Sequence, residues 1–238
     1  MTAVDLNADV GESYGRWQLG DDASLLPLLT SANVACGFHA GDPLTLRRTI
    51  AAALDAGVVV GAQVSYPDVV GFGRRAMDLE PDQLEADVLY QLSALDGLCR
   101  AAGTGVRYLK PHGALYHRTL VDENQAGAVV AALLAHGGSL PVLTTAGSAL
   151  AVVASAQGLR VVSEGYADRR YDDAGHLVPR TDPGALLTDP ADVASQAVRL
   201  AGTVESLCLH GDTPGAPVLA RAVREALAAA DVAVESFA

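Results

Sequence analysis

Lysine is almost absent from this chain. Lys110 is the only one, and the other 15 of the 16 basic residues are arginine. Acidic residues outnumber basic ones by 28 to 16, which gives a formal net charge of −12, and the longest basic runs are pairs of arginines. Because nucleic-acid binding needs a positive face that neutralises phosphates, this balance argues against a nucleic-acid-binding protein.

Cysteine and long apolar runs are also scarce. The three cysteines, Cys36, Cys99 and Cys208, are far apart and form no CxxC motif, so we expect buried, reduced thiols. Cys36 and Cys208 lie near predicted strand ends, which leaves a reactive thiol as the alternative. No stretch is long enough to span a bilayer, and the residues after Met1 lack the features of a signal peptide. We therefore expect a cytoplasmic protein that does not enter membranes.

Apolar residues make up 50% of the 238 residues, whereas aromatic residues make up only 5%. Such a chain is long enough for one domain with a sizeable core, which must be built largely from small aliphatic side chains. No linker and no shift in composition divides it. We therefore expect residues 1–238 to form a single domain.

Strand and helix patterns alternate along the whole chain. Strands are predicted at 3–10, from 31, and at 58–63, 106–109, 140–145, 159–163 and 204–209. Helices are predicted at 21–29, 43–56, from 81, at 122–137, 148–157, after 190 and at 216–230. Seven such β-α units imply parallel strands joined by crossover helices, as in an α/β barrel.

Polar side chains gather on or just after six of the predicted strands. They are Asp5, Asn7, Asp9 and Glu12; His39; Gln63 and Asp68; Lys110 and His112; Glu164, Asp168 and Arg169; and His210 and Asp212. In a barrel of parallel strands the carboxyl ends meet at one mouth, and the inward face near that mouth can hold polar groups. Any one of these residues could be a helix cap or a surface pair, but together they predict one active site.

Lys110 follows the apolar run 106–109, which is typical of a short buried strand. Pro111 should block further ladder pairing, so Lys110 and His112 are expected where this strand gives way to a loop. Loops at that end of the strands carry chemistry in α/β folds. The alternative is a strand-end lysine whose ammonium group lies in solvent. We expect substitution of Lys110 to change fold stability little.

Six motifs resemble those of the LamB/YcsF family, the family of the A subunit of 5-oxoprolinase. They are residues 5–12 (DLNADVGE), 31–43 (SANVACGFHAGDP), 71–75 (GFGRR), 110–116 (KPHGALY), Glu164 with 167–169 (ADR), and 208–214 (CLHGDTP). They cover essentially the whole chain in the order of the family. The resemblance implies a distorted seven-stranded, TIM-like (β/α) barrel related to glycoside hydrolases and polysaccharide deacetylases.

The resemblance also implies an activity. With subunits B and C, the family member is a cytoplasmic hydrolase that opens 5-oxo-L-proline (pyroglutamate), a cyclic amide, to L-glutamate, while ATP is cleaved to ADP and phosphate. A Walker A motif needs Gly-Lys before Ser or Thr, and the only lysine here precedes proline. ATP, expected with Mg²⁺, is therefore held by another arrangement or chiefly by a partner subunit.

The chain departs from the family after the third predicted strand. The family usually has a Gly-Ala-His-Pro pattern there, whereas this chain has Gln63 in place of the histidine. In the related deacetylases an acidic residue and two histidines hold a divalent metal, and here Asp9 and His39 supply only part of such a set. An amide is a poor ligand for zinc, cobalt or nickel. We therefore predict no metal ligands in the site and no requirement for a tightly bound transition metal.

Ring opening needs a base for water, a proton donor to the ring nitrogen, and positive charge for phosphate or carboxylate oxygens. Asp9 and Glu12 are the candidates for the base, His39 and His112 are those for the donor, and Lys110 supplies a compact positive charge. The expected substrate-binding residues are Asn7, Asn33, Asp68, Arg74, Glu164, Asp168, Arg169, His210 and Asp212. Two other functions stay open: a stand-alone metal-dependent amide or acetyl hydrolase, and a non-catalytic lactam-binding or scaffolding subunit.

Overall fold

The computed structural model describes residues 2–238, in which strands and helices alternate. The strands are β1 (Thr2–Val10), β2 (Ser31–Ala35), β3 (Val59–Val64), β4 (Tyr108–Pro111), β5 (Val142–Thr144), β6 (Val161–Tyr166), β7 (Ser206–Leu209) and β8 (Val232–Val234). The helices are α1 (Asp22–Leu25), the 3₁₀ helix η1 (Leu26–Leu28), α2 (Pro43–Asp55), α3 (Pro81–Ala101), α4 (Gly113–Thr119), α5 (Glu123–His136), α6 (Ala149–Ala156), α7 (Pro190–Ala201) and α8 (Ala216–Ala229).

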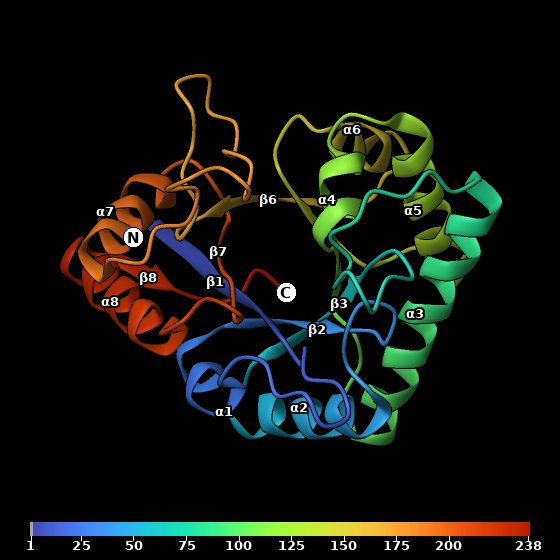
Figure 1. Ribbon diagram of the computed structural model, residues 1–238, viewed down its shortest axis with the longest axis horizontal. Helices are drawn as coiled ribbons and strands as arrows, with labels where there is room; N and C mark the ends of the chain where they lie inside the picture. The colour runs from blue at the N-terminus through green and yellow to red at the C-terminus, as the bar shows by residue number, and fades with distance from the viewer. Residues whose placement is uncertain (1) are drawn as a thin grey trace.

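Strands β1 to β7 form a closed parallel ring, because each pairs with the next and β7 pairs with β1. Helices surround this ring (Figure 1). The predicted α/β barrel is therefore confirmed. The short strand β8, which the sequence analysis did not predict, pairs with residues 2–4 of β1, before the pairing of β1 with β2 begins at Asn7. No helix within residues 2–238 has the length and apolar character needed to cross a membrane.

Helix α2 begins and ends where the sequence predicted. The side chain of Asp42 accepts hydrogen bonds from the backbone amides of Leu44 and Thr45, and Pro43 is the first helical residue. Gly57 has a φ of 70° just past the helix end, in the left-handed region that glycine adopts without strain. Local chemistry is thus enough to set both ends of α2.

Asp122 caps the N-terminus of helix α5, and Gln125 does not form the reciprocal bond of a capping box. Asp122 accepts hydrogen bonds from the backbone amides of Asn124 and Gln125. The side chain of Gln125 instead accepts the Tyr66 hydroxyl at 2.8 Å and donates to the Leu79 carbonyl at 2.7 Å. Gln125 therefore ties α5 to the segment between β3 and α3 rather than closing its own helix end.

Small residues allow the barrel interior to be filled by a few large side chains. Tyr108 packs over Gly61, where a Cβ atom would come within 2.2 Å of the tyrosine ring. The Tyr108 hydroxyl donates to the Asn33 side-chain oxygen at 2.6 Å. Outside the barrel, one face of α3 is buried, and each fully buried leucine there contributes roughly 1.5–3 kcal/mol. The apolar residues of this face are Leu84, Val88, Leu92, Leu95 and Cys99.

Two strands run further than the sequence predicted. β4 continues through Lys110 to Pro111, which pairs with Val64 at the last position of the ladder, where its missing N–H costs no pairing. β6 likewise continues through Glu164 to Tyr166. Both Lys110 and Glu164 therefore belong to the barrel wall rather than to loops. The short helix α4, too short to show a clear apolar period, was not predicted and lies inward of α5 (Figure 1).

Candidate active site

A cavity of about 440 Å³ opens at the carboxyl ends of the strands. Its lining includes four basic residues, Arg74, Lys110, Arg169 and Arg180, but Asp9 is the only acidic residue that lines it within the described part of the chain. The imidazoles that line it are those of His112, His117 and His210. The cavity is therefore suited to a small anionic molecule.

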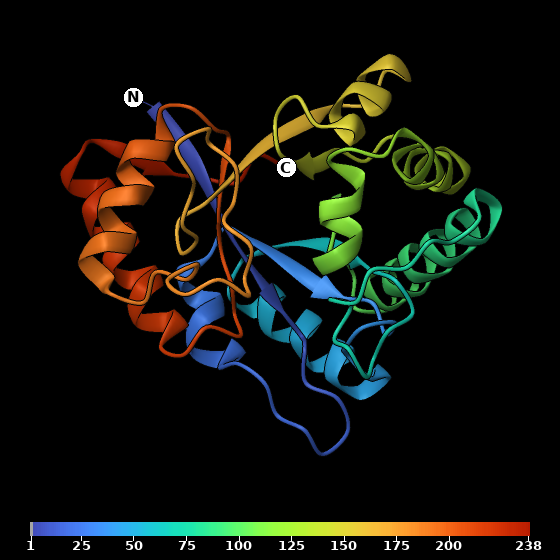
Figure 2. The same ribbon diagram turned by 45° about the horizontal axis from the view of Figure 1, so that its top comes forward.

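The segment between β6 and α7 supplies much of the cavity wall. It folds back on itself through bridges between Arg169 and Leu186 and between Tyr171 and Leu177, and it is drawn in orange in Figure 2. Arg180 lies on this segment and lines the cavity. No local sequence pattern marks Arg180, because its place depends on how the whole segment folds back.

Lys110 is buried and paired, which corrects the expectation of a strand-end ammonium group whose loss costs little stability. Its Nζ atom donates to Glu164 Oε1 at 2.5 Å and to Asn7 Oδ1 at 3.3 Å, and it lies 3.6 Å from Asp9 Oδ1. Burial lowers the pKa of Lys110, but the neighbouring Cys208, Glu164 and Asp9 outweigh it and hold the pKa well above its usual value. Lys110 is therefore a fixed positive charge.

Asp9 combines access to the cavity with a stable negative charge. Burial raises its pKa, but Lys110, His210 and the hydrogen bond from Asn33, whose Nδ2 atom lies 2.9 Å from Asp9 Oδ1, outweigh burial and lower it. An ionised carboxylate that faces a small cavity can accept a proton from bound water.

Below Asp9, the inward face of β1 is fully engaged with other side chains. Asn7 donates to the Ser206 hydroxyl at 2.7 Å and accepts from Asn33 at 2.7 Å. Asp5 accepts hydrogen bonds from the hydroxyls of Ser31 and Ser206. Neither Asn7 nor Asn33 lines the cavity. These two predicted substrate-binding residues, like Glu164, instead hold the side chains that line it.

Asp168 holds His210 in a defined orientation. His210 Nδ1 lies 2.9 Å from Asp168 Oδ1, and the His210 backbone amide donates to Asp168 Oδ2 at 3.0 Å. The His210 ring stacks on Tyr166. Burial raises the pKa of Asp168, but the neighbouring His210 outweighs the effect of burial, so the pKa lies below its usual value. An ionised Asp168 favours a proton on Nδ1, which leaves the Nε2 atom of His210 for a ligand in the cavity.

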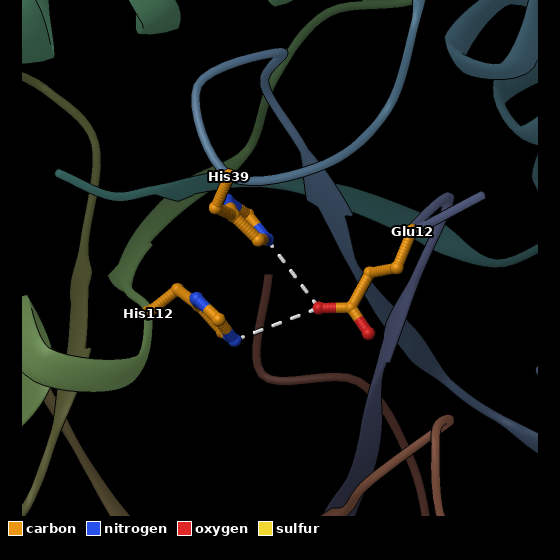
Figure 3. Close-up of side chains that lie close together, drawn as sticks. All are labelled: Glu12, His39 and His112. Carbon is orange, nitrogen blue, oxygen red and sulfur yellow. Dashed lines mark hydrogen bonds and ion pairs between the residues drawn. The ribbon is translucent and has the colours of Figure 1, made fainter. Parts of the chain in front are cut away.

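Glu12, His39 and His112 form a compact group beside the cavity (Figure 3). Glu12 Oε1 lies 3.4 Å from His39 Nε2 and 3.6 Å from His112 Nε2, and the two rings stack at 4.0 Å. Burial lowers the pKa of His39 to about 4. The pKa of His112 lies well below its usual value because of burial and the nearby His39 and Arg74. The pKa of Glu12 lies well above its usual value because of burial and the nearby Asp9 and Asp212. Both imidazoles are therefore neutral at pH 7.

Gln63, for which the motif resemblance implies a histidine, lies next to this group. Its carboxamide is beside the His39 ring. Neither its Nε2 nor its Oε1 atom has a hydrogen-bond partner within residues 2–238, and the same holds for the Nδ1 atoms of His39 and His112. Several buried polar atoms around Gln63 therefore have no hydrogen-bond partner in the described residues.

Arg74, Asp212 and Arg180 join three loops at the mouth of the barrel. Asp212 Oδ2 lies 2.5 Å from an Arg74 nitrogen and 3.6 Å from an Arg180 nitrogen. Asp212 therefore positions two cavity arginines. Asp68 pairs with Arg75 and accepts the backbone amide of Gly71, so it shapes the loop after β3 and does not line the cavity.

The predicted site residues thus fall into two sets. Asp9, Arg74, Lys110, His112, Arg169 and His210 line the cavity, whereas Glu12, His39, Asn7, Asn33, Asp68, Glu164, Asp168 and Asp212 do not. Arg180 and His117 line it but were not predicted. Burial raises the pKa of both Cys36 and Cys208, which favours the expectation of inert thiols over a reactive one.

Comparison with known proteins agrees with the resemblance seen in the motifs. The sequence profile of the LamB/YcsF family matches residues 4–238. A protein from Streptomyces avermitilis that is named as the A subunit of 5-oxoprolinase is 55% identical, over 99% of this chain and 100% of that protein. One of the same name from Kocuria rhizophila is 52% identical, over 100% of both.

Solved structures extend the comparison to the fold. The lactam utilization protein from Thermus thermophilus matches with a TM-score of 0.93 and 42% identity, over 99% of this chain and 100% of that one. A family 4 carbohydrate esterase from Streptomyces lividans has a TM-score of 0.54 at 15% identity, over 100% of this chain and 93% of that one, which shows a shared fold. By its sequence profile and by relatives that match it from end to end, the chain belongs to the LamB/YcsF family.

Proposed function

We propose that this chain is the lactam-opening subunit of an ATP-dependent 5-oxoprolinase, which hydrolyses 5-oxo-L-proline to L-glutamate while ATP is cleaved to ADP and phosphate. The observation that carries the proposal is the contrast within the cavity between one carboxylate, Asp9, and four basic side chains. A lactam that bears a carboxylate needs positive charge for binding and a single base for reaction. The names of the relatives support the same substrate.

The residues of the cavity suit the successive parts of this reaction. Asp9 takes a proton from water as the water oxygen attacks the lactam carbonyl carbon, and Lys110 stabilises the negative charge around it. His112 or His210, once protonated on Nε2, donates that proton to the ring nitrogen as the carbon–nitrogen bond breaks. Arg74 and Arg180 hold the carboxylate of the substrate or a phosphoryl group, since guanidinium groups bind both.

The lactam is an unstrained amide, so its hydrolysis needs activation. ATP can provide it by phosphorylating the amide oxygen, with release of ADP, which makes the carbon that bears this oxygen a better electrophile. Once the carbon–nitrogen bond has broken, hydrolysis of the remaining acyl phosphate releases phosphate and leaves the carboxylate of glutamate. The chain has no Gly-Lys-Ser/Thr phosphate loop. We therefore infer that ATP and its Mg²⁺ bind chiefly to partner subunits, of the B and C type, in a cytoplasmic complex.

The test is an assay of glutamate formation and ATP hydrolysis, each dependent on 5-oxoproline. The chain alone, the partner subunits alone and the full mixture are compared. We expect little turnover from either part and full turnover from the mixture. ATP-independent turnover by the chain alone would favour a stand-alone hydrolase, and full glutamate formation by the partners alone would make this chain non-catalytic.

A further inference from the structure

We propose that Glu12, His39 and His112 form a binding site for a divalent transition-metal ion, for which zinc is the best match. One carboxylate and two imidazoles are a ligand set that zinc binds well, and such sites with three protein ligands keep a further position for water or substrate. The proposal concerns metal binding alone and does not depend on the lactam reaction.

The spacing of the ligand atoms carries the argument. Glu12 Oε1 lies 3.4 Å from His39 Nε2 and 3.6 Å from His112 Nε2, and all three ligand atoms lie within 4.8 Å of one another. Ligands about 2.1 Å from a tetrahedral zinc ion lie about 3.4 Å apart. The two Nε2 atoms therefore approach the same carboxylate oxygen at the separation that an ion between them would require (Figure 3).

The ligands are held by three different parts of a rigid barrel. Glu12 follows β1, His39 lies on the loop after β2, and His112 directly follows β4. The backbone at Gly73 packs against both side chains, because a Cβ atom there would come within 2.9 Å of His112 Nδ1 and of His39 Cβ. All three side chains are buried, so the site is largely formed before any ion binds.

Gln63 fits this site as a support rather than as a ligand. When the Nε2 atom of an imidazole binds a metal, its Nδ1 atom carries the proton and needs an acceptor. The Gln63 carboxamide lies beside His39 and has an oxygen without a partner in the described residues. The prediction of a site without metal considered a third ligand only after β3. In the structure His112, which follows β4, lies 3.6 Å from Glu12.

His112 also lines the cavity, so an ion held by the group lies at the cavity edge. A metal there can polarise a carbonyl oxygen or lower the pKa of a bound water molecule. Because Nε2 of His112 then binds the ion, His210 would be the remaining candidate for the proton donor.

The test measures metal binding directly on the full chain after chelator treatment. Co²⁺ is titrated as a probe whose visible absorption reports the ligand geometry, and Zn²⁺ is measured by equilibrium dialysis with elemental analysis. We expect one ion per chain. Removal of a supporting residue outside the ligands typically costs 10–100-fold in affinity, so Glu12→Gln and His112→Ala should each cost at least about 100-fold.

His136→Ala is the matched control, because His136 pairs with Asp96 at 3.4 Å in another part of the barrel. Its binding should equal that of the unaltered chain. Zn²⁺ should also raise the melting temperature of the unaltered chain but not that of Glu12→Gln, which keeps the shape of the side chain. Absence of stoichiometric binding to the unaltered chain, or equal binding by folded Glu12→Gln, would overturn the proposal.

Discussion

Lys110 and Glu164 form an ion pair inside the barrel, with 2.5 Å between Nζ and Oε1. Both side chains are almost completely excluded from water. The pair joins β4 to β6, and the same ammonium group lies 3.6 Å from Asp9 on β1. One positive charge therefore stabilises the interior of the barrel and sets the charge environment of the carboxylate that faces the cavity.

We predict that Lys110→Met is impaired in both stability and turnover. Removal of the ammonium group leaves Glu164 buried without its partner, which should cost about 3–5 kcal/mol of unfolding free energy. Loss of one electrostatic contact in the transition state should lower kcat about 100-fold or more. Urea unfolding and kcat of the reconstituted complex give the two values. Lys110→Arg should also lose activity, because a planar guanidinium group does not fit this buried site.

The double variant Lys110→Met/Glu164→Gln separates the two effects. It should recover much of the lost stability, since no buried charge of the pair remains, but little of the lost turnover. Arg107→Met, which removes an exposed charge just before the same strand, is the control. Near-normal kcat in a folded Lys110→Met protein would remove Lys110 from the catalytic account.

The contact between Asp168 and His210 predicts a selective loss of turnover. In Asp168→Asn, the carboxylate that orients the His210 ring through Nδ1 is gone, so Nε2 is held less well for proton transfer. We expect kcat to fall about 100-fold or more, while KM for 5-oxoproline changes little. Asp173→Asn, at an exposed position of the same segment between β6 and α7, should behave like the unaltered chain. An unchanged kcat in Asp168→Asn would show that His210 acts in no proton transfer.

Arg180 is predicted to bind the anionic group of the substrate. It lies at the cavity and is held by Asp212. A hydrogen bond to a charged group contributes about 1.5–3 kcal/mol, so Arg180→Ala should raise KM by about 10-fold or more, with a smaller change in kcat. The exposed Arg170, on the same segment, provides the control variant Arg170→Ala. Equal KM values for the two variants would contradict this role.

The ionisation of Asp5 should lower the free energy of unfolding as the pH rises. Burial raises its pKa from 3.8 to about 6, although hydrogen bonds from Ser206, Ser31 and Thr30 lower it. The folded state therefore holds a proton that the unfolded state has lost. Its stabilising effect is complete below about pH 3.8 and disappears as the pH rises through about 6.

The size of this effect is up to about 3 kcal/mol between pH 4 and pH 7. Urea unfolding across that range should show a larger fall for the unaltered chain than for Asp5→Asn, which cannot ionise. Parallel curves for the two proteins would mean that Asp5 does not titrate between these values.

The fold could be predicted from the sequence where local chemistry decides. Asp42, Pro43 and Gly57 mark the ends of α2, and alternating apolar patterns mark the strands of the ring. The short strand β8 and helix α4 were missed because three or seven residues show no clear period. The predicted end of β4, at residue 109, was too early. Pro111 was expected to block pairing, but proline is tolerated at the last position of a ladder.

The site could be predicted in part, because parallel strands bring their carboxyl ends together. That rule places Asp9, Lys110, His112 and His210 around one cavity. It does not say which residue of a strand end reaches the cavity and which lies one layer below, as Asn7 does. The pairing of Lys110 with Glu164 joins residues 54 positions apart, and the position of Arg180 depends on a long irregular segment. Neither leaves a local signal.

Asp9 is the centre of the proposed chemistry, and Asp9→Asn tests it most directly. The carboxamide keeps the size of the side chain and can still accept the hydrogen bond from Asn33, but it cannot take a proton from water. The measurement is the rate of glutamate formation from 5-oxoproline by the ATP-supplied complex that contains this variant, with a melting curve to show that the chain is folded. We predict that the rate falls at least about 100-fold. Normal glutamate formation by a folded Asp9→Asn complex would contradict the assignment of the active site to this cavity.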